Sequence, residues 1–372
     1  MELPENIRPM AHSDLVVNLL REPGNASKLS EGDWDVLVRQ ARHADVMGQL
    51  HARLSDASQL DHVPEAARQH LETAWNLSLR HRLAVRWELL GIADTLALLN
   101  IPVVLLKGAA YYAADRKAAR GRLFTDVDIL VPKSTLEAVE QKFIRSGWVP
   151  THLNAYDQRY YRKWMHELPP MQHARRGTLI DIHHTLLPPT SGVHCDATAL
   201  IVSAQPLEDA ELSAFKILAP SDMLLHSATH LFYGEFDRGL RELLDLDQLI
   251  REMGAEPDFW PSTINRAQQL DLLNPLHHAV RYTHLLLGTP IPADVFRAPL
   301  DPAVGPTQQR LLDALFLRAF RPNHSSCNDF ATRLARWLAF VRSHWLRMPV
   351  HLLVPHLLYK SLIAPRKKGA EV

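Results

Sequence analysis

Two aspartates lie in a short segment of alternating residues, and this segment limits the folds that the chain can adopt. In LFTDVDILV, residues 123–131, Phe124, Asp126 and Asp128 fall on one face of an extended backbone, and apolar residues fall on the other. This alternation is typical of a strand with one buried face and one polar face. We therefore expect a half-buried strand that carries both carboxylates on its functional face.

The regions on either side of this strand have helical spacing. Before residue 100, apolar residues recur at intervals of four, as at Leu79, Leu83 and Trp87. Residues 101–218 contain short strands and helices, including a second alternating segment, GTLIDIHHTL. After residue 220 we expect helices at about 238–252, 263–287, 307–320, 328–346 and 350–362. The predicted fold class is α+β: a helical N-terminal region (1–100), a core with a small mixed sheet (101–218) and a helical C-terminal domain (219–372).

Composition and charge exclude several classes of protein. Hydrophobic residues make up 47% of the 372 residues, which is too many for a largely disordered chain. The 41 basic and 41 acidic side chains balance, so no overall basic field favours nucleic-acid binding. Cys195 and Cys327 are too far apart in sequence for a disulfide framework or a zinc knuckle. Because the first twenty residues do not resemble a signal peptide, we expect a cytoplasmic protein.

The carboxylates of Asp126 and Asp128 indicate a metal site. Side chains at positions i and i+2 of a strand share a face, and two neighbouring carboxylates repel each other. A hard divalent ion such as Mg²⁺ removes that repulsion, whereas the alternative is a pair of solvated carboxylates. Relief of the repulsion also predicts that Asp128→Asn melts at a higher temperature without Mg²⁺. Asp245 and Asp247 have the same spacing but lie in a helical pattern, where they point about 200° apart and cannot chelate one ion.

Two further features extend the predicted site. The run PVVLL leads into Lys107, Gly108 and Ala109 at a strand-to-helix junction, where free backbone N–H groups and the Lys107 ammonium favour phosphate. Asp181 lies on the second alternating strand, two residues before His183. A third carboxylate would complete a two-metal site for in-line attack on phosphorus, although a half-exposed structural aspartate is the alternative.

In this order, LLKGAA, RLFTDVDILV, HELPP, LIDIHHTLLP and LRELLDLDQL resemble a bacterial family of uncharacterised nucleotidyltransferase-like proteins. That family is part of the DNA polymerase β-type nucleotidyltransferase superfamily. The resemblance implies a small mixed-sheet nucleotidyltransferase core. It also implies that Asp126 and Asp128 hold two Mg²⁺ ions, and that Asp181 shares one of them and helps to deprotonate an acceptor hydroxyl. The implied reaction moves a nucleoside monophosphate from an NTP, such as ATP, to that acceptor.

The chain departs from the superfamily pattern in its loop. Where the superfamily usually has Gly-Gly or Gly-Ser, this chain has Gly108-Ala109, which keeps the backbone donors but loses a side-chain contact. The following loop is basic, and we interpret its cations either as phosphate ligands or as a solvated surface. Arg122 is the preferred phosphate ligand because it is nearest to the carboxylates, and His166 and His183 are candidates for lining the cleft. The other basic residues of the loop are Arg116, Lys117 and Arg120.

Other interpretations stay open at this point. His226 and His230 share a helix face and are spaced to bind Zn²⁺, but Ser227 stands where a metalloprotease has glutamate. A hydrolase could instead combine Asp181 or Asp222 with a looser cluster of His183, His184, His194 and Cys195. An inactive binding or assembly module is a third alternative.

The unknown acceptor is expected to be a small molecule, a sugar or a protein rather than a nucleic acid. The apolar C-terminal stretch from Trp337, with its interspersed cations, is consistent either with contact at a membrane surface or with core helices followed by a basic tail.

Overall fold

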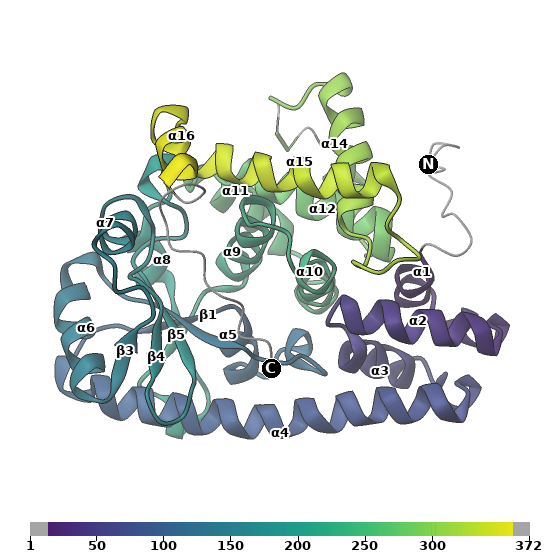
Figure 1. The fold of residues 1–372 in the computed structure, drawn as a ribbon, viewed down its shortest axis with the longest axis horizontal. Coiled ribbons are helices and arrows are strands. Elements are labelled where there is room, and N and C mark those ends of the chain that lie inside the picture. The colour runs from purple at the N-terminus through teal and green to yellow at the C-terminus, as the bar shows by residue number, and fades with distance from the viewer. Residues whose placement is uncertain (1–13, 299, 302, 360–372) are drawn as a thin grey trace.

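The computed structural model describes residues 14–298, 300–301 and 303–359. The N-terminal region is helical, as predicted. Its longest element, α4, runs along one side of the molecule, and α15 lies along the opposite side (Figure 1). The first helices are α1 (Leu15–Arg21), α2 (Glu31–His43), α3 (Met47–Asp56) and α4 (Glu65–Leu96).

One mixed sheet of seven strands forms the core, in the order β3-β4-β5-β2-β1-β7-β6. The two longest strands, β2 and β5, are adjacent and parallel, whereas β1 runs antiparallel to β2. The strands are β1 (Val104–Leu106), β2 (Asp126–Leu130), β3 (Trp148–Pro150), β4 (Met171–His173), β5 (Leu179–His183), β6 (Gln205–Pro206) and β7 (Lys216–Ile217). The α+β class and the mixed sheet are therefore confirmed.

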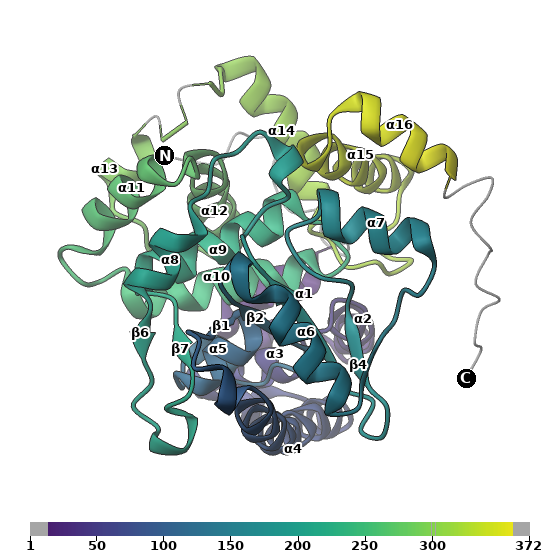
Figure 2. The same ribbon diagram turned by 90° about the vertical axis from the view of Figure 1, so that its left-hand side faces the viewer.

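Four helices alternate with the strands. Figure 2 shows α6 and α7 in front of the sheet, at the end of the molecule that faces the viewer. Helix α5 follows β1 directly and contacts both β1 and β2, so its first residue is placed beside the predicted carboxylates. The four helices are α5 (Lys107–Ala113), α6 (Leu136–Arg145), α7 (Ala155–Trp164) and α8 (Ala197–Ser203).

The C-terminal region is helical, with two differences from the prediction: a short helix over residues 293–297 was not expected, and one expected helix is divided. The helix expected over 263–287 is two helices, because the chain turns at Leu270–Leu272, where Asp271 has a left-handed backbone (φ +57°). The helix expected over 350–362 is described as far as Leu358, and residues 360–362 lie outside the described part. The helices are α9 (Pro220–Tyr233), α10 (Gly239–Met253), α11 (Phe259–Gln269), α12 (Leu273–Leu287), α13 (Ala293–Arg297), α14 (Pro306–Ala319), α15 (Phe330–Arg347) and α16 (Val350–Leu358).

Helix α4 confirms the predicted helical spacing and shows which face is covered. Its buried residues include Leu71, Val85 and Leu89, which lie on the side of the helix that faces the molecule. Leu83 and Trp87 fall on the opposite side and are 64% and 76% exposed. Periodicity predicted that these residues share a face, but it could not predict that this face lies in solvent. The proposed domain boundaries after residues 100 and 218 stay a prediction.

Candidate active site

The three predicted aspartates converge on one side of the sheet. In the parallel pair of β2 and β5, Asp128 lies opposite Asp181 in register, and Asp126 lies two residues before Asp128. One carboxylate oxygen from each of the three lies within 4.8 Å of the others. The register of two neighbouring strands therefore assembles the carboxylate cluster that the sequence predicted.

Asp128 is not half-exposed, as its strand pattern predicted, but buried. Lys107 at the start of α5 lies over it, with Nζ 2.7 Å from Oδ1, and His183 Nε2 lies 3.0 Å from the same oxygen. Burial by itself raises the pKa of Asp128, but the Lys107 ammonium and the His183 hydrogen bond outweigh it and hold the pKa well below its usual range. Asp128 is therefore ionised and compensated by protein groups.

Lys107 is held in an uncommon conformation to make this contact. Its φ is +46°, in the left-handed region that side chains other than glycine rarely adopt. Burial lowers the pKa of Lys107, but the carboxylates of Asp128 and Asp126 raise it further than burial lowers it, so the ammonium stays charged. Backbone strain at a functional position is common where the surrounding structure determines the geometry.

Asp181 has the opposite electrostatic environment. Burial first, and then the nearby carboxylates of Glu167 and Asp128, raise the pKa of Asp181 well above its usual value. In this structure the Lys107 charge offsets the repulsion at Asp128, and the raised pKa of Asp181 favours its neutral form. The Lys107 contact argues against the predicted stabilisation by Asp128→Asn, because that substitution would remove the partner of a largely buried lysine.

A second group of polar side chains adjoins the carboxylates. His166, Glu167 and His183 have ligating atoms within 4.8 Å of one another, with Glu167 Oε2 3.5 Å from His183 Nε2. An isolated β-bridge between Glu167 and His183 places the loop against β5. Both predicted histidines thus lie at the site. Glu167 was not predicted as a site residue, although it directly follows His166 in the HELPP segment.

A cavity of about 520 Å³ opens at Asp126. Thr125 and Asp126 line it from the core, and Ser227 and His230 line it from α9. Asp128 and Asp181 are not among the described residues that line it, although their carboxylates lie within 4.8 Å of that of Asp126. The cationic side chains that line it are Lys107, Arg122, Arg238, Arg241 and Arg347.

Gly108 has a different role from the predicted backbone contact with phosphate. Gly108 and Ala109 are buried and are not among the described residues lining the cavity. A Cβ on Gly108 would lie 2.0 Å from Arg122 Nη1 and 2.9 Å from Phe124 Cδ1. The absent side chain therefore leaves room for the Arg122 guanidinium, whose Nε donates to Asp245 Oδ2 at 3.0 Å.

Two of the three other cations of the basic loop form ion pairs away from the carboxylates. Arg116 Nη1 lies 2.9 Å from Glu252 on α10, and Arg120 contacts Asp56 through two bonds of 2.8 and 2.9 Å. The backbone N–H of Lys117 donates to Glu252. These residues attach the loop to helices α10 and α3, so of the four cations only Arg122 both borders the carboxylates and lines the cavity.

The histidine alternative is not supported by the geometry. The described residues contain two groups of three side chains that could hold a metal ion. Neither group includes His226, His230, His194 or Cys195. His230 Nδ1 instead lies 3.0 Å from Glu242 Oε2, and that contact, opposed by burial, lowers the pKa of Glu242 to about 2. Asp222 is engaged by Arg266 at 2.7 Å. These residues join helices to one another.

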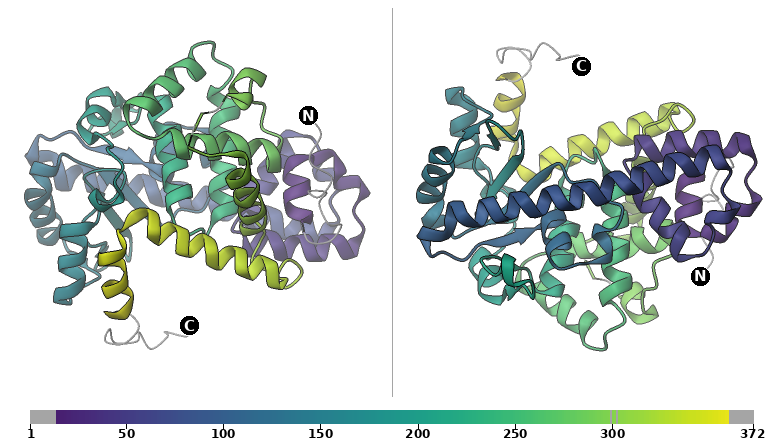
Figure 3. Two further views of the ribbon diagram at one scale, coloured as in Figure 1. Left: turned by 90° about the horizontal axis from the view of Figure 1, so that it is seen from above. Right: turned by 90° about the horizontal axis from the view of Figure 1, so that it is seen from below.

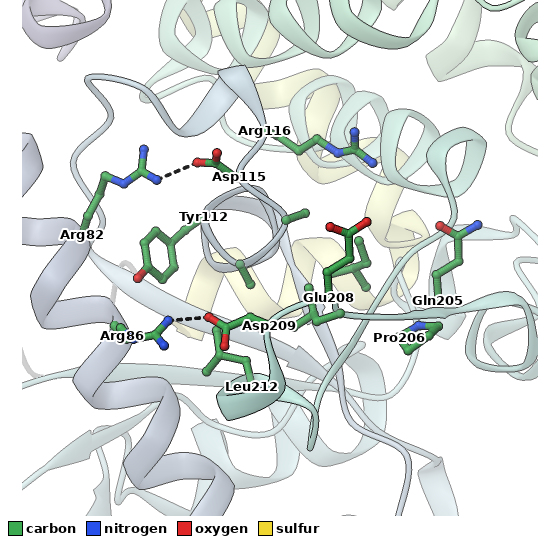
Figure 4. Close-up of a pocket in the computed structure, with 14 residues that line it drawn as sticks. Arg82, Arg86, Tyr112, Asp115, Arg116, Gln205, Pro206, Glu208, Asp209 and Leu212 are labelled. Carbon is green, nitrogen blue, oxygen red and sulfur yellow. Dashed lines mark hydrogen bonds and ion pairs between the residues drawn. The ribbon is translucent and has the colours of Figure 1, made fainter.

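A second cavity, of about 480 Å³, lies between α4, the end of α5 and the β6–β7 hairpin (Figure 4). Its arginines are already paired: Arg82 with Asp115 at 2.8 Å and Arg86 with Asp209 at 2.5 Å. None of the described residues that line it belongs to the carboxylate cluster. We therefore place the candidate site at the cavity beside Asp126.

The donor set fits a hard divalent cation. Asp126, Asp128 and Asp181 offer only oxygen atoms, the ligands that Mg²⁺ prefers. The Lys107 ammonium, 2.7 Å from Asp128, shows that the protein already places a positive charge at this position. Binding of a dication would favour the ionised form of Asp181 and would compete with Lys107 for Asp128.

Comparison with known families supports this assignment at the level of the family. A sequence model of a family described as "Uncharacterised nucleotidyltransferase" matches residues 30–288. The match covers more than half of the chain, which therefore belongs to this nucleotidyltransferase family. A search of curated proteins found no match.

Proposed function

We propose that this member of the nucleotidyltransferase family transfers a nucleoside monophosphate from an NTP to an acceptor hydroxyl and releases pyrophosphate. The observation that carries the proposal is the convergence of Asp126, Asp128 and Asp181 beside a cavity lined with cations. A triphosphate needs positive charge along its length, and a reacting phosphorus needs carboxylate-bound cations beside it. The cavity and the cluster together offer both.

Three carboxylates would hold the metal. Asp126, Asp128 and Asp181 would bind two Mg²⁺ ions, which supply charge neutralisation of the phosphates and orientation for in-line attack. Lys107 Nζ, which lies 2.7 Å from Asp128 Oδ1, would then turn toward a phosphate oxygen. Arg122 would steady the phosphates from an orientation set by Asp245.

The acceptor proton needs a destination in this reaction. A bond forms between the acceptor oxygen and the α-phosphorus, the bond from that phosphorus to the bridging oxygen breaks, and pyrophosphate leaves with its electrons. The hydroxyl proton passes to the ionised carboxylate of Asp181, one oxygen of which lies within 4.8 Å of the other two carboxylates. Glu167, beside Asp181 and 3.5 Å from His183, would accept the proton in turn.

One observation favours a second candidate, an inactive nucleotide-binding or assembly module. Lys107 already neutralises Asp128, so the fold does not need a metal ion to compensate its buried carboxylate. A family member that had lost catalysis could keep this ion pair for stability. The two candidates differ in turnover, which a labelling experiment measures.

The purified protein is incubated with Mg²⁺ and cell extract, once with α-labelled and once with γ-labelled NTP. We expect the α-label on an acceptor and the γ-label in pyrophosphate. Asp126→Asn should abolish the transfer. Asp115→Asn should retain it, because Asp115 is exposed and does not line the cavity beside Asp126. Transfer of the γ-label to an acceptor would overturn nucleotidyl transfer, and NTP binding without any transfer would establish the inactive module.

A further inference from the structure

Helix α15 exposes large apolar side chains and buries small or polar ones, whereas most helices of globular proteins bury their apolar face. Its side toward the protein carries small or polar buried residues, including Thr332, Ala339 and Ser343. Its outward side carries large apolar residues, of which Trp337 is 59% and Trp345 62% exposed. The other exposed apolar residues of this helix are Phe330, Leu334, Leu338, Phe340 and Val341. At 1.5 Å per residue, this apolar face extends over about 27 Å.

Helix α16 continues the apolar surface. Val350, Val354 and Leu357 are exposed on it. The end of this segment is attached to the core, because the ring of Tyr359 stacks on Tyr156 of α7 with centroids 3.7 Å apart. Figure 3 shows α15 across the face seen from above, and Figure 1 shows α16 at its end, beside α7. Together α15 and α16 form one surface, which we call the α15–α16 surface.

The charge of this segment is one-sided, although the whole chain is neutral. Residues 330–370 contain eight Lys and Arg residues and no Asp or Glu. Arg333 is exposed beside the apolar face of α15. Three of the cations, Arg366, Lys367 and Lys368, follow α16 in a part of the chain outside the described residues. Arg336 and Arg342 donate to backbone carbonyls and Arg347 pairs with Glu235, so Arg333 is the arginine of α15 that is exposed beside this face. Exposed tryptophans in a segment whose sequence has this excess of cations are a combination that binds anionic lipid headgroups.

We propose that the α15–α16 surface docks on an anionic lipid bilayer and lies in its interface. Tryptophan rings favour the headgroup level, and apolar side chains between them enter the acyl boundary. None of the helices in the described ranges is long and apolar enough to cross a membrane, so the contact is made from one side. A second copy of the chain is the competing occupant, and the oligomeric state in solution distinguishes it from a bilayer.

The surface borders the candidate site. Arg347, the last residue of α15, lines the cavity beside Asp126 and pairs with Glu235 at 2.9 Å. A docked protein would thus hold the cavity close to the bilayer. The docking proposal does not depend on the proposed transfer reaction, because vesicle binding is measured without NTP.

Helix α4 offers a matched control. It also exposes a tryptophan, Trp87, and leucines on one face, but residues 65–96 contain four acidic and four arginine residues. It lies on the side of the molecule opposite α15 (Figure 3). If exposed tryptophan alone caused lipid binding, α4 would bind as well, and substitution of Trp87 would weaken it.

The full-length protein is sedimented with vesicles of phosphatidylcholine, with and without phosphatidylglycerol. We expect binding to the mixed vesicles and roughly ten-fold weaker binding to phosphatidylcholine alone. Trp337→Gln/Trp345→Gln should lose binding by roughly ten-fold or more, and Arg366→Gln/Lys367→Gln/Lys368→Gln should weaken it only on anionic vesicles. Trp87→Gln should bind like the wild type.

Three results would overturn the proposal. One is absence of binding to both kinds of vesicle, and another is equal loss of binding in Trp87→Gln. The third is a dimer in analytical ultracentrifugation that dissociates in the double tryptophan variant, which would assign the surface to a second copy. Circular dichroism melting of each variant shows that the fold is retained, which we expect because the substituted tryptophans are exposed.

Discussion

Asp128 and Asp181 lie opposite each other in adjacent strands but differ in charge. Lys107 and His183 both contact Asp128 and lower its pKa, whereas burial and the Glu167 carboxylate raise the pKa of Asp181. The lowered pKa of Asp128 contributes stability that is present above its unfolded pKa and is lost only in strong acid. Ionisation of Asp181 acts in the other direction and costs stability as the pH rises through its raised pKa.

Opposite stability changes should follow from the two matched substitutions. Asp128→Asn leaves the buried Lys107 without its main partner and should lower the unfolding free energy by roughly 3 kcal/mol. Asp181→Asn removes a group whose ionised form is disfavoured and should raise the melting temperature by about 1–3 °C. Thermal unfolding at neutral pH in EDTA measures both. A higher melting temperature for Asp128→Asn would contradict the charge assignment, and both variants should lose stabilisation by Mg²⁺ and NTP.

At the scale of elements, α10 joins the N-terminal helices to the site. Asp245 accepts from Gln49 of α3 at 2.9 Å and from Arg122 at 3.0 Å. Asp247 points to another side, where it accepts from Arg53 at 2.6 Å and Arg251 at 2.8 Å. The sequence correctly predicted that these aspartates do not chelate one ion, but both are buried in separate ion-pair networks.

Substitutions in α10 should therefore separate stability from nucleotide binding. Asp247→Ala strands a buried arginine and should cost about 3–5 kcal/mol of unfolding free energy, with stabilisation by Mg²⁺ and NTP retained. Asp245→Asn releases Arg122 and should reduce that stabilisation as well. Urea unfolding with and without Mg²⁺ and NTP measures the two effects. An equal response to nucleotide in both variants would show that Arg122 has no part in binding.

Across the whole molecule, buried histidines make stability depend on pH. Burial holds the pKa of His166, His226 and His278 well below the usual value and lowers that of His184 to about 4. The unfolded chain therefore binds more protons than the folded chain below pH 6.5, and stability falls as the pH drops. Asp181, with its raised pKa, offsets part of this loss.

As the pH is lowered from about 6.5 to about 4, the free energy of unfolding should decrease. Each buried histidine contributes at most about 1.4 kcal/mol per pH unit to this decrease. His278→Gln should reduce the slope by about one proton, because its ring is fully buried among aromatic side chains such as Phe232. His70→Gln, on an exposed position of α4, is the matched control. Urea unfolding at several pH values measures the slope, and an unchanged slope in His278→Gln would contradict the assignment.

Local periodicity was sufficient to predict the fold class, the helical and strand segments, and the shared face of Asp126 and Asp128, whereas the register of β2 and β5 brings Asp181 to them. Alternation placed Asp126 and Asp128 on one face because the period of a strand is two, and the same rule placed Asp181 and His183 together. These are properties of neighbouring residues, which local geometry dictates. The ordered motifs also indicated the family, which the match over residues 30–288 confirmed.

Contacts between distant segments set which groups meet and which faces are covered. That Lys107 neutralises Asp128, and that Glu167 joins the site, depends on contacts between segments distant in sequence. Helical spacing in α4 and α15 was visible, but which face packs against the protein depends on what the rest of the chain places beside it. Pairing and burial set charge and exposure, and neither has a local signature in the sequence.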